Sequence, residues 1–140
     1  RIEDVYWAGL VHDIGKMLIP LEVLNKKGKL TASEYEVIKE HPVLGGNALS
    51  SSSSLKHIAK FVRHHHERWD GKGYPDELKK DQIPLESQIL CAADSWDAMR
   101  SKRTYREPLS FNHALAELKD NLGTQFAPAV TKALIAVLEN

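Results

Sequence analysis

Apolar residues recur along this chain at the three- and four-residue spacing that is typical of helices, and no stretch alternates convincingly as a strand would. The clearest case is the segment containing Leu55, Ile58, Ala59 and Val62, which occupy positions i, i+3, i+4 and i+7. The last third of the chain repeats this spacing in two amphipathic segments, with Leu115, Leu118 and Leu122 followed by Val130, Leu134, Val137 and Leu138. The pattern predicts an all-α fold.

The first predicted helix spans residues 3–13 and is apolar on most of its sides, which predicts a buried helix. It places His12 and Asp13 at its C-terminal end, and Gly15 is a plausible C-cap. An ionised aspartate that is buried without a partner costs several kcal/mol, so Asp13 requires a cation. Lys16, three residues later, is one candidate, and a metal ion is the other.

Local signals predict several helix boundaries. Thr31 and Glu34 have the spacing of a capping box, and Pro42 indicates that one helix ends near His41 and another begins there. The run from Ser50 to Ser54 reads as a loop that ends in an N-cap serine. Pro84 begins a helix on which Leu90, Asp94 and Asp97 share one stripe, and a helix cap cannot explain carboxylates two turns inside it.

Three consecutive histidines, His64, His65 and His66, follow the helix that contains Val62. Neighbouring helical residues lie about 100° apart, so two of the three can share one site while the third points elsewhere. The loop Gly71-Lys72-Gly73-Tyr74-Pro75 comes soon after and suits a rigid turn. Donor atoms beside a shaped loop indicate a metal site with a substrate-binding edge.

Length and composition limit the number of domains and the classes of ligand that this chain can bind. The 140 residues correspond to a single domain, 1–140. With 19 basic and 19 acidic residues the formal charge is zero, which argues against binding of polymeric nucleic acid.

Cys91 is the only cysteine, so disulfides and thiolate-rich zinc sites are excluded and a cytoplasmic location is expected. No membrane-spanning run occurs, so no membrane contact is expected. Because the chain opens at Arg1 without Met, we expect an N-terminally incomplete fragment of a longer protein.

The candidate ligands have nitrogen and oxygen donors only. They are His12, Asp13, His41, His65, His66 and Asp94. This donor set suits Fe, Mn, Ni, Co or Zn. Two such ions held about 3.5–4 Å apart lower the pKa of a shared water and polarise a phosphoryl oxygen, which suits phosphoester hydrolysis. Any one of these histidines alone is weak evidence, and His57, His64 and His113 are interpreted as structural or surface residues.

Four groups of residues carry a resemblance to a known family. They are His12-Asp13-Ile14-Gly15-Lys16, then His41-Pro42, then His65-His66-Glu67-Arg68-Trp69-Asp70-Gly71-Lys72-Gly73-Tyr74-Pro75, and finally Ala93-Asp94-Ser95-Trp96-Asp97-Ala98-Met99 with Ser101, Arg103, Tyr105 and Arg106. Together they closely resemble the HD-GYP domains, a branch of the HD superfamily. The motifs cover most of the chain, and the long Gly-Tyr-Pro motif separates this branch from the rest of the superfamily.

The resemblance implies a helical bundle that hydrolyses cyclic di-GMP to the linear dinucleotide, GMP or both, with some members preferring a cyclic GMP-AMP. It also implies a centre of two or three divalent ions, most often iron, with the six candidate ligands around it and Asp13 as a bridge. Lys16 would stabilise charge or donate a proton near the scissile phosphate. Tyr74 would approach the substrate, Arg103 and Arg106 would hold phosphate or guanine, and Asp97 would orient a ligand.

The chain departs from the family pattern in two places, and the first keeps alternatives open. Family domains usually have an upstream helix with a further His ligand, and this chain begins too close to His12 to include it. The second is Lys27, which stands where the family commonly has Pro, and we expect it only to loosen that turn. The alternatives are an inactive module that binds a cyclic dinucleotide or a protein, and another HD-type nucleotide phosphohydrolase. A homodimer that supplies the missing surface is also left open.

Overall fold

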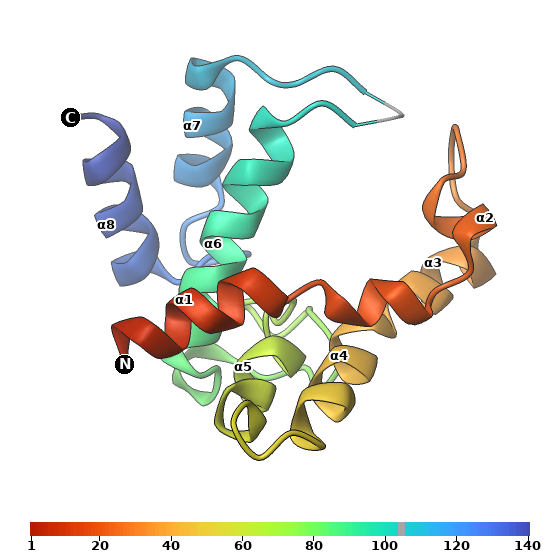
Figure 1. Cartoon of the computed structure of the whole chain (residues 1–140). Helices are drawn as coiled ribbons and strands as arrows, with labels where there is room; N and C mark the ends of the chain where they lie inside the picture. Colours follow the sequence, from red (N-terminus) through yellow and green to blue (C-terminus); the bar gives the residue numbers. More distant parts are fainter. Residues whose placement is uncertain (104–105) are drawn as a thin grey trace.

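The computed structural model describes residues 1–103 and 106–140, and the regular structure within them is entirely helical (Figure 1). The helices are α1 (Ile2–Val11), η1 (Ile14–Leu18), α2 (Leu21–Leu24), α3 (Ala32–Ile38), α4 (His41–Ser50), η2 (Lys56–Ile58), α5 (Ala59–Arg63), η3 (Lys80–Gln82), α6 (Leu85–Arg100), α7 (Phe111–Asp120) and α8 (Pro128–Leu138), where η marks a 3-10 helix. The all-α prediction is confirmed. None of these helices is long and apolar enough to cross a membrane.

Most of the predicted helix boundaries are found. Thr31 and Glu34 form the capping box at the start of α3, α4 begins at His41 with Pro42 in its first turn, and Pro84 precedes α6. The predicted N-cap serine is wrong, because Leu55 precedes η2 and makes no side-chain cap. Ser50 instead belongs to the last turn of α4, where its hydroxyl donates to the carbonyl of Gly46.

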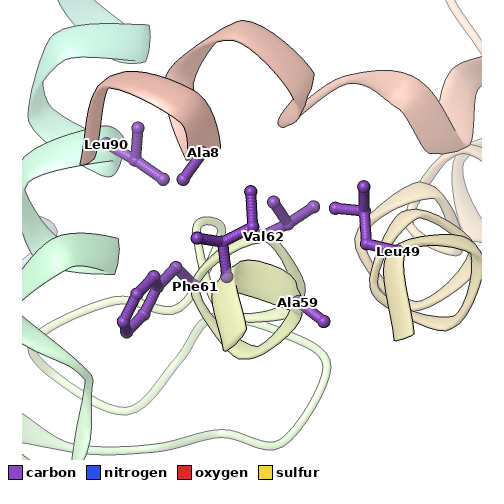
Figure 2. Packing of buried hydrophobic residues seen from close by; sticks show 7 residues of the cluster. Ala8, Leu49, Ala59, Phe61, Val62 and Leu90 are labelled. Atoms are coloured by element: carbon purple, nitrogen blue, oxygen red, sulfur yellow. The ribbon is translucent and has the colours of Figure 1, made fainter. Parts of the chain in front are cut away.

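A first hydrophobic core joins α1, α4, α5 and α6, and Figure 2 shows Ala8, Leu49, Val62 and Leu90 facing the space between these helices. Its buried members are Ala8, Leu49, Ile58, Ala59, Phe61, Val62 and Leu90. The four predicted apolar positions of the segment 55–62 all contribute to it. This core fixes the ends of the helices from which the candidate ligands project.

A second core joins α6 to the two C-terminal helices, α7 and α8, and includes Ala92, Leu115, Leu118, Phe126 and Ile135. Because Leu90 belongs to the first core and Ala92 to the second, α6 packs on both sides and ties them together (Figure 1). Val137 was predicted on the apolar face of α8 but is 69% exposed, because the packed face of this helix is centred on Ile135.

Gly15 is not the C-cap that the sequence suggests. It lies inside η1 and is buried, and a Cβ at this position would meet the carbonyl oxygen of His41 and the backbone nitrogen of Gly45 at well below contact distance. The glycine therefore allows η1 to lie directly against the first turn of α4. This close approach brings Asp13 beside His41.

Helix α1 is far less buried than its composition predicts. Ala8 is its only buried residue, whereas Tyr6, Trp7 and Leu10 are 62%, 48% and 60% exposed. The reason is that α1 packs on α5 and α6 through the side that contains Ala8, and the described part of the chain supplies no element that covers its other sides. Composition gives the apolar character of a helix but not the number of neighbours it has.

Candidate metal centre

Six side chains converge from four parts of the fold. His12 is the C-cap of α1 and Asp13 follows it. His41 is the first residue of α4, and Asp94 lies in the third turn of α6. The remaining two, His65 and His66, lie in the turn after α5, because that helix ends at Arg63. Helix ends and a turn thus supply all the candidate ligands except Asp94.

Three of the imidazoles are oriented by the same contact. The Nδ1 atoms of His12, His41 and His65 lie 2.6, 2.8 and 2.5 Å from the carbonyl oxygens of Gly9, Ile38 and Val62, each three residues earlier. A carbonyl can only accept, so Nδ1 donates and, in a neutral ring, Nε2 keeps its lone pair. The Nε2 atoms of His41 and His65 are buried with no hydrogen-bond partner in the described chain. Buried nitrogens of this kind are costly unless something binds them.

The donor atoms form two overlapping groups. His41, His65 and His66 make one, and His12, His65 and Asp94 make the other, and the ligand atoms within each lie within 4.8 Å of one another. The Asp13 carboxylate lies beside both groups, with Oδ2 3.2 Å from His12 Nε2 and Oδ1 3.6 Å from His41 Nε2. All six predicted ligands are therefore neighbours, and Asp13 faces a histidine with each of its oxygens.

Burial and neighbouring charges set the protonation of these groups. Burial lowers the pKa of His65 to about 4 and, together with the adjacent His65 and His41, that of His66 to about 3. Burial also opposes the charge of His12, but hydrogen bonds to Asp13 and Asp94 outweigh it and raise the pKa of His12 to about 10. Burial would raise the pKa of Asp13, yet His12 and Lys16 hold it far below its ordinary value. Two neutral imidazoles and an ionised carboxylate are the forms that bind a cation.

The sequence left Lys16 and a metal ion as alternative partners for Asp13. Lys16 Nζ lies 3.2 Å from Asp13 Oδ1, so the ion pair is present. It does not account for the rest of the site, because the Nε2 atoms of His41 and His65 still lack a partner within the described residues. The donor set therefore fits a divalent ion with Lys16 beside it.

A cavity of about 460 Å³ opens next to the ligands. His66 forms part of its wall, and the ring of Tyr74 stacks on that imidazole at 5.0 Å and 12°. Lys39 Nζ lies 5.2 Å from the centre of the Tyr74 ring. The further lining residues include Tyr35, Arg68, Lys72, Cys91 and Gln125. Cations and aromatic rings beside a metal-ligand cluster suit a ligand that carries phosphate and a flat base.

Comparison with known proteins agrees with this geometry. A family model described as an HD domain matches residues 2–130 of the chain. The chain belongs to the HD domain family. The expected HD-GYP resemblance is confirmed, because several curated relatives of this HD domain are named cyclic di-GMP phosphodiesterases.

Three of these similarities are informative. A cyclic di-GMP phosphodiesterase of Vibrio cholerae is 43% identical, with 99% of this chain covering 30% of the relative. One of Thermotoga maritima is 40% identical, with 96% of this chain covering 37% of the relative. A crystal structure of a cyclic GMP-AMP specific phosphodiesterase of V. cholerae matches with a TM-score of 0.71 and 20% identity, covering 98% of this chain and 38% of that one. This HD domain thus spans about a third of the length of these relatives.

The predicted substrate-binding residues are placed unevenly. Tyr74 lies in the wall of the cavity beside the ligands. Arg106 lines a second hollow of about 210 Å³, which shares Ser95 and Gln125 with that cavity, and its guanidinium donates to the carbonyl of Ala98. Arg103 lines neither of these hollows, and its backbone amide donates to the carbonyl of Arg106.

Tyr105 and Asp97 were also singled out in the sequence. Tyr105, part of the motif, lies outside the described residues. Asp97 was expected to orient a ligand, but its exposed carboxylate accepts a hydrogen bond from the hydroxyl of Ser101 at the end of α6. Asp94 and Asp97 share one stripe of α6, but Asp94 is half-buried among the ligands whereas Asp97, one turn closer to the helix end, is exposed.

The sequence analysis gave no role to several polar residues of the cavity wall, namely Tyr35 and Lys39, and Arg68 and Lys72 inside the quoted motif. A weak signal existed for two of them. Tyr35 and Lys39 are four residues apart at the end of α3, a spacing that places both on one side of a helix. Their composition gave no sign that this side faces a cavity, because tyrosine and lysine are common on solvent-facing helices.

Proposed function

We propose that this HD domain hydrolyses a phosphodiester bond of a cyclic dinucleotide, either cyclic di-GMP or a cyclic GMP-AMP, with divalent metal ions. One observation carries the proposal. The unpartnered Nε2 atoms of His41 and His65 converge with Asp13 and Asp94 beside a cavity walled by lysine, arginine and tyrosine. The curated relatives named for cyclic di-GMP and 3'3'-cGAMP hydrolysis support this substrate class.

We propose two or three ions, with iron first and Mn, Ni, Co or Zn as the alternatives. His41 and His66 would hold one ion and His12 and Asp94 another, since they belong to the two groups of adjacent donors, and the single free Nε2 of His65 would bind one of the two ions. Asp13 would bridge them, because its two oxygens face His12 and His41. When bound, such ions supply Lewis-acid chemistry toward a phosphodiester and its attacking water.

The side chains around the ions would bind and orient the dinucleotide. Lys16, held by Asp13, would stabilise negative charge or donate a proton at the scissile phosphate. The Tyr74 ring, fixed on His66, would contact a base or the sugar-phosphate backbone. Arg103 and Arg106 would hold the second phosphate or a guanine, since an arginine fork suits such planar acceptors.

A direct test is incubation of metal-loaded protein with cyclic di-GMP and with 3'3'-cGAMP, followed by chromatography of the products. We expect the linear dinucleotide, GMP or both to appear from cyclic di-GMP. Tight binding of either compound without turnover would favour the inactive binding module. Turnover only of a non-cyclic nucleotide would favour another HD-type phosphohydrolase.

The cavity wall gives a second test, with a matched lysine as the control. Lys39→Met removes an ammonium group beside Tyr74 while keeping an aliphatic side chain of similar length, and we expect the Kd for the cyclic dinucleotide to rise about 10-fold. Lys27 is exposed and is not one of the lining residues, so Lys27→Met should leave the Kd unchanged. Equal affinities for the two variants would remove Lys39 from the binding site.

A further inference from the structure

A third group of adjacent donors, His64, Glu67 and Asp76, lies outside the centre described above. Its two carboxylates and His64 Nε2 already have protein partners, whereas His64 Nδ1 is buried without one in the described chain. Glu67 is only 1% exposed, and its Oε1 and Oε2 accept the backbone amides of Asp76 at 2.7 Å and Leu78 at 3.0 Å. The Asp76 carboxylate accepts the Arg63 fork at 2.9 and 3.0 Å and His64 Nε2 at 2.8 Å. Because both carboxylates are hydrogen-bonded to protein groups, the cluster joins chain segments and differs from the metal centre.

The segment that this cluster holds is the loop that carries Tyr74. Gly73 has no room for a side chain, because a Cβ there would lie 2.4 Å from the nitrogen of Arg68 and 2.5 Å from the carbonyl oxygen of His66. The loop therefore packs directly on the backbone around Glu67. The Tyr74 amide donates to the same His66 carbonyl at 3.3 Å, and its ring stacks on the His66 imidazole.

We infer that Glu67 is a positioning residue that fixes Tyr74 against His66, through the two amides that follow Tyr74 in the loop. The carboxylate reaches neither the cavity nor the ligand atoms of the centre. By binding the amides of Asp76 and Leu78, the carboxylate fixes the backbone of residues 76–78. The position of this backbone in turn sets the position of the Tyr74 side chain. The kinetic consequence of this inference rests on the proposed function, whereas its structural consequence does not.

The chain offers a matched pair of substitutions. Glu67→Gln keeps the size of the side chain but leaves one acceptor oxygen, and it places an NH2 group against a backbone N–H. Glu77→Gln makes the same chemical change in the same loop at an exposed residue. The first readout is amide hydrogen exchange at Tyr74, Asp76 and Leu78. We expect exchange at least about 10-fold faster in Glu67→Gln and unchanged in Glu77→Gln.

The second readout separates positioning from general stabilisation. We expect Glu67→Gln to raise the KM for the cyclic dinucleotide about 10- to 100-fold, with metal content retained and kcat much less affected. In a Tyr74→Ala background the same substitution should no longer change KM, because Glu67 acts through Tyr74. A KM effect that persists without Tyr74, or no KM effect at all, would overturn the positioning role.

The inference stays testable if Glu67→Gln does not fold or if the wild type shows no turnover. If Glu67→Gln does not fold, Arg63→Met tests the same loop from the Asp76 side, with a smaller KM increase of about 2- to 5-fold because that ion pair is partly exposed. Absence of turnover in the wild type would reject the proposed function alone. The exchange rates would then decide the inference, and unchanged exchange at Tyr74, Asp76 and Leu78 in the variant would overturn it.

Discussion

At the scale of single residues, the centre is set by how three imidazoles are held. His12, His41 and His65 each donate Nδ1–H to a carbonyl three residues earlier, which fixes the tautomer and aims Nε2 inward. The contact is local, so each ring is already oriented when its helix end forms. The helices then need only bring three oriented rings together.

That these side chains are candidates for one site could be inferred from the sequence, but the orientations of their rings could not. Buried histidine and aspartate are costly, so His12, Asp13, His41 and Asp94 stood out from their apolar surroundings. Nothing in the spacing shows which nitrogen of a ring meets a carbonyl, since that depends on the backbone at each helix end. Lys39 was missed for the opposite reason, because a lysine at the end of a helix needs no explanation.

The protonation of His12 gives a pH-dependent prediction. In the metal-free protein the pKa of His12 is raised to about 10, because Asp13 and Asp94 bind its protonated ring. This interaction stabilises the fold fully below pH 6.5, the ordinary pKa, and the stabilisation is lost as the pH rises through 10. A metal ion at His12 must displace that proton. We therefore expect metal affinity to rise between pH 6 and 9 by about one log unit per pH unit.

Calorimetry in buffers of different ionisation enthalpy measures the released proton directly. We expect about one proton per chain at pH 7 from this residue, and one fewer in His12→Gln. His113 is exposed and belongs to none of the donor groups, so His113→Gln serves as the control and should behave as the wild type. Identical proton release in wild type and His12→Gln would contradict the assignment of His12.

At the scale of the elements, the site depends on how closely η1 approaches α4. Gly15 packs against the first turn of α4, and the sequence could not show this, because a glycine after a helix usually marks its end. The close approach is a tertiary contact between residues 26 positions apart, and local pattern carries no information about it. The same limit explains why α1 was expected to be buried on most sides.

Substitution of Gly15 and of Gly9 by alanine tests this contact, because we expect the two changes to shift the free energy of unfolding in opposite directions. Gly15→Ala should destabilise the fold by about 1–3 kcal/mol, because its Cβ would meet backbone atoms of His41 and Gly45. Gly9 lies inside α1, and its Cβ would make an ordinary 3.6 Å contact with Leu90. Gly9→Ala should therefore stabilise the fold by about 0.5–1 kcal/mol.

Urea unfolding of both variants measures these changes, and metal titration adds a second readout. Gly15→Ala should also bind metal more weakly, since it moves Asp13 away from His41, whereas Gly9→Ala should bind it as the wild type does. A neutral Gly15→Ala variant would show that η1 and α4 are not as close as described.

At the scale of the whole molecule, α6 connects the two halves of the fold. It contributes Leu90 to one core, Ala92 to the other and Asp94 to the candidate metal centre. The helical class and most helix boundaries could be predicted, because amphipathic spacing, a capping box and helix-starting prolines are local signals. The division into two cores could not, since it depends on which helices pack against each side of α6.

The central claim is that the six converging side chains bind divalent metal, and elemental analysis tests it most directly. Protein stripped with chelator, reloaded with Fe(II) or Mn(II) and desalted should retain about two ions per chain. Asp13→Ala should retain fewer while circular dichroism shows its helices intact, and Asp120→Ala, at an exposed aspartate at the end of α7, should match the wild type. Retention of no ion by the wild type, or of as many ions by Asp13→Ala, would contradict the account.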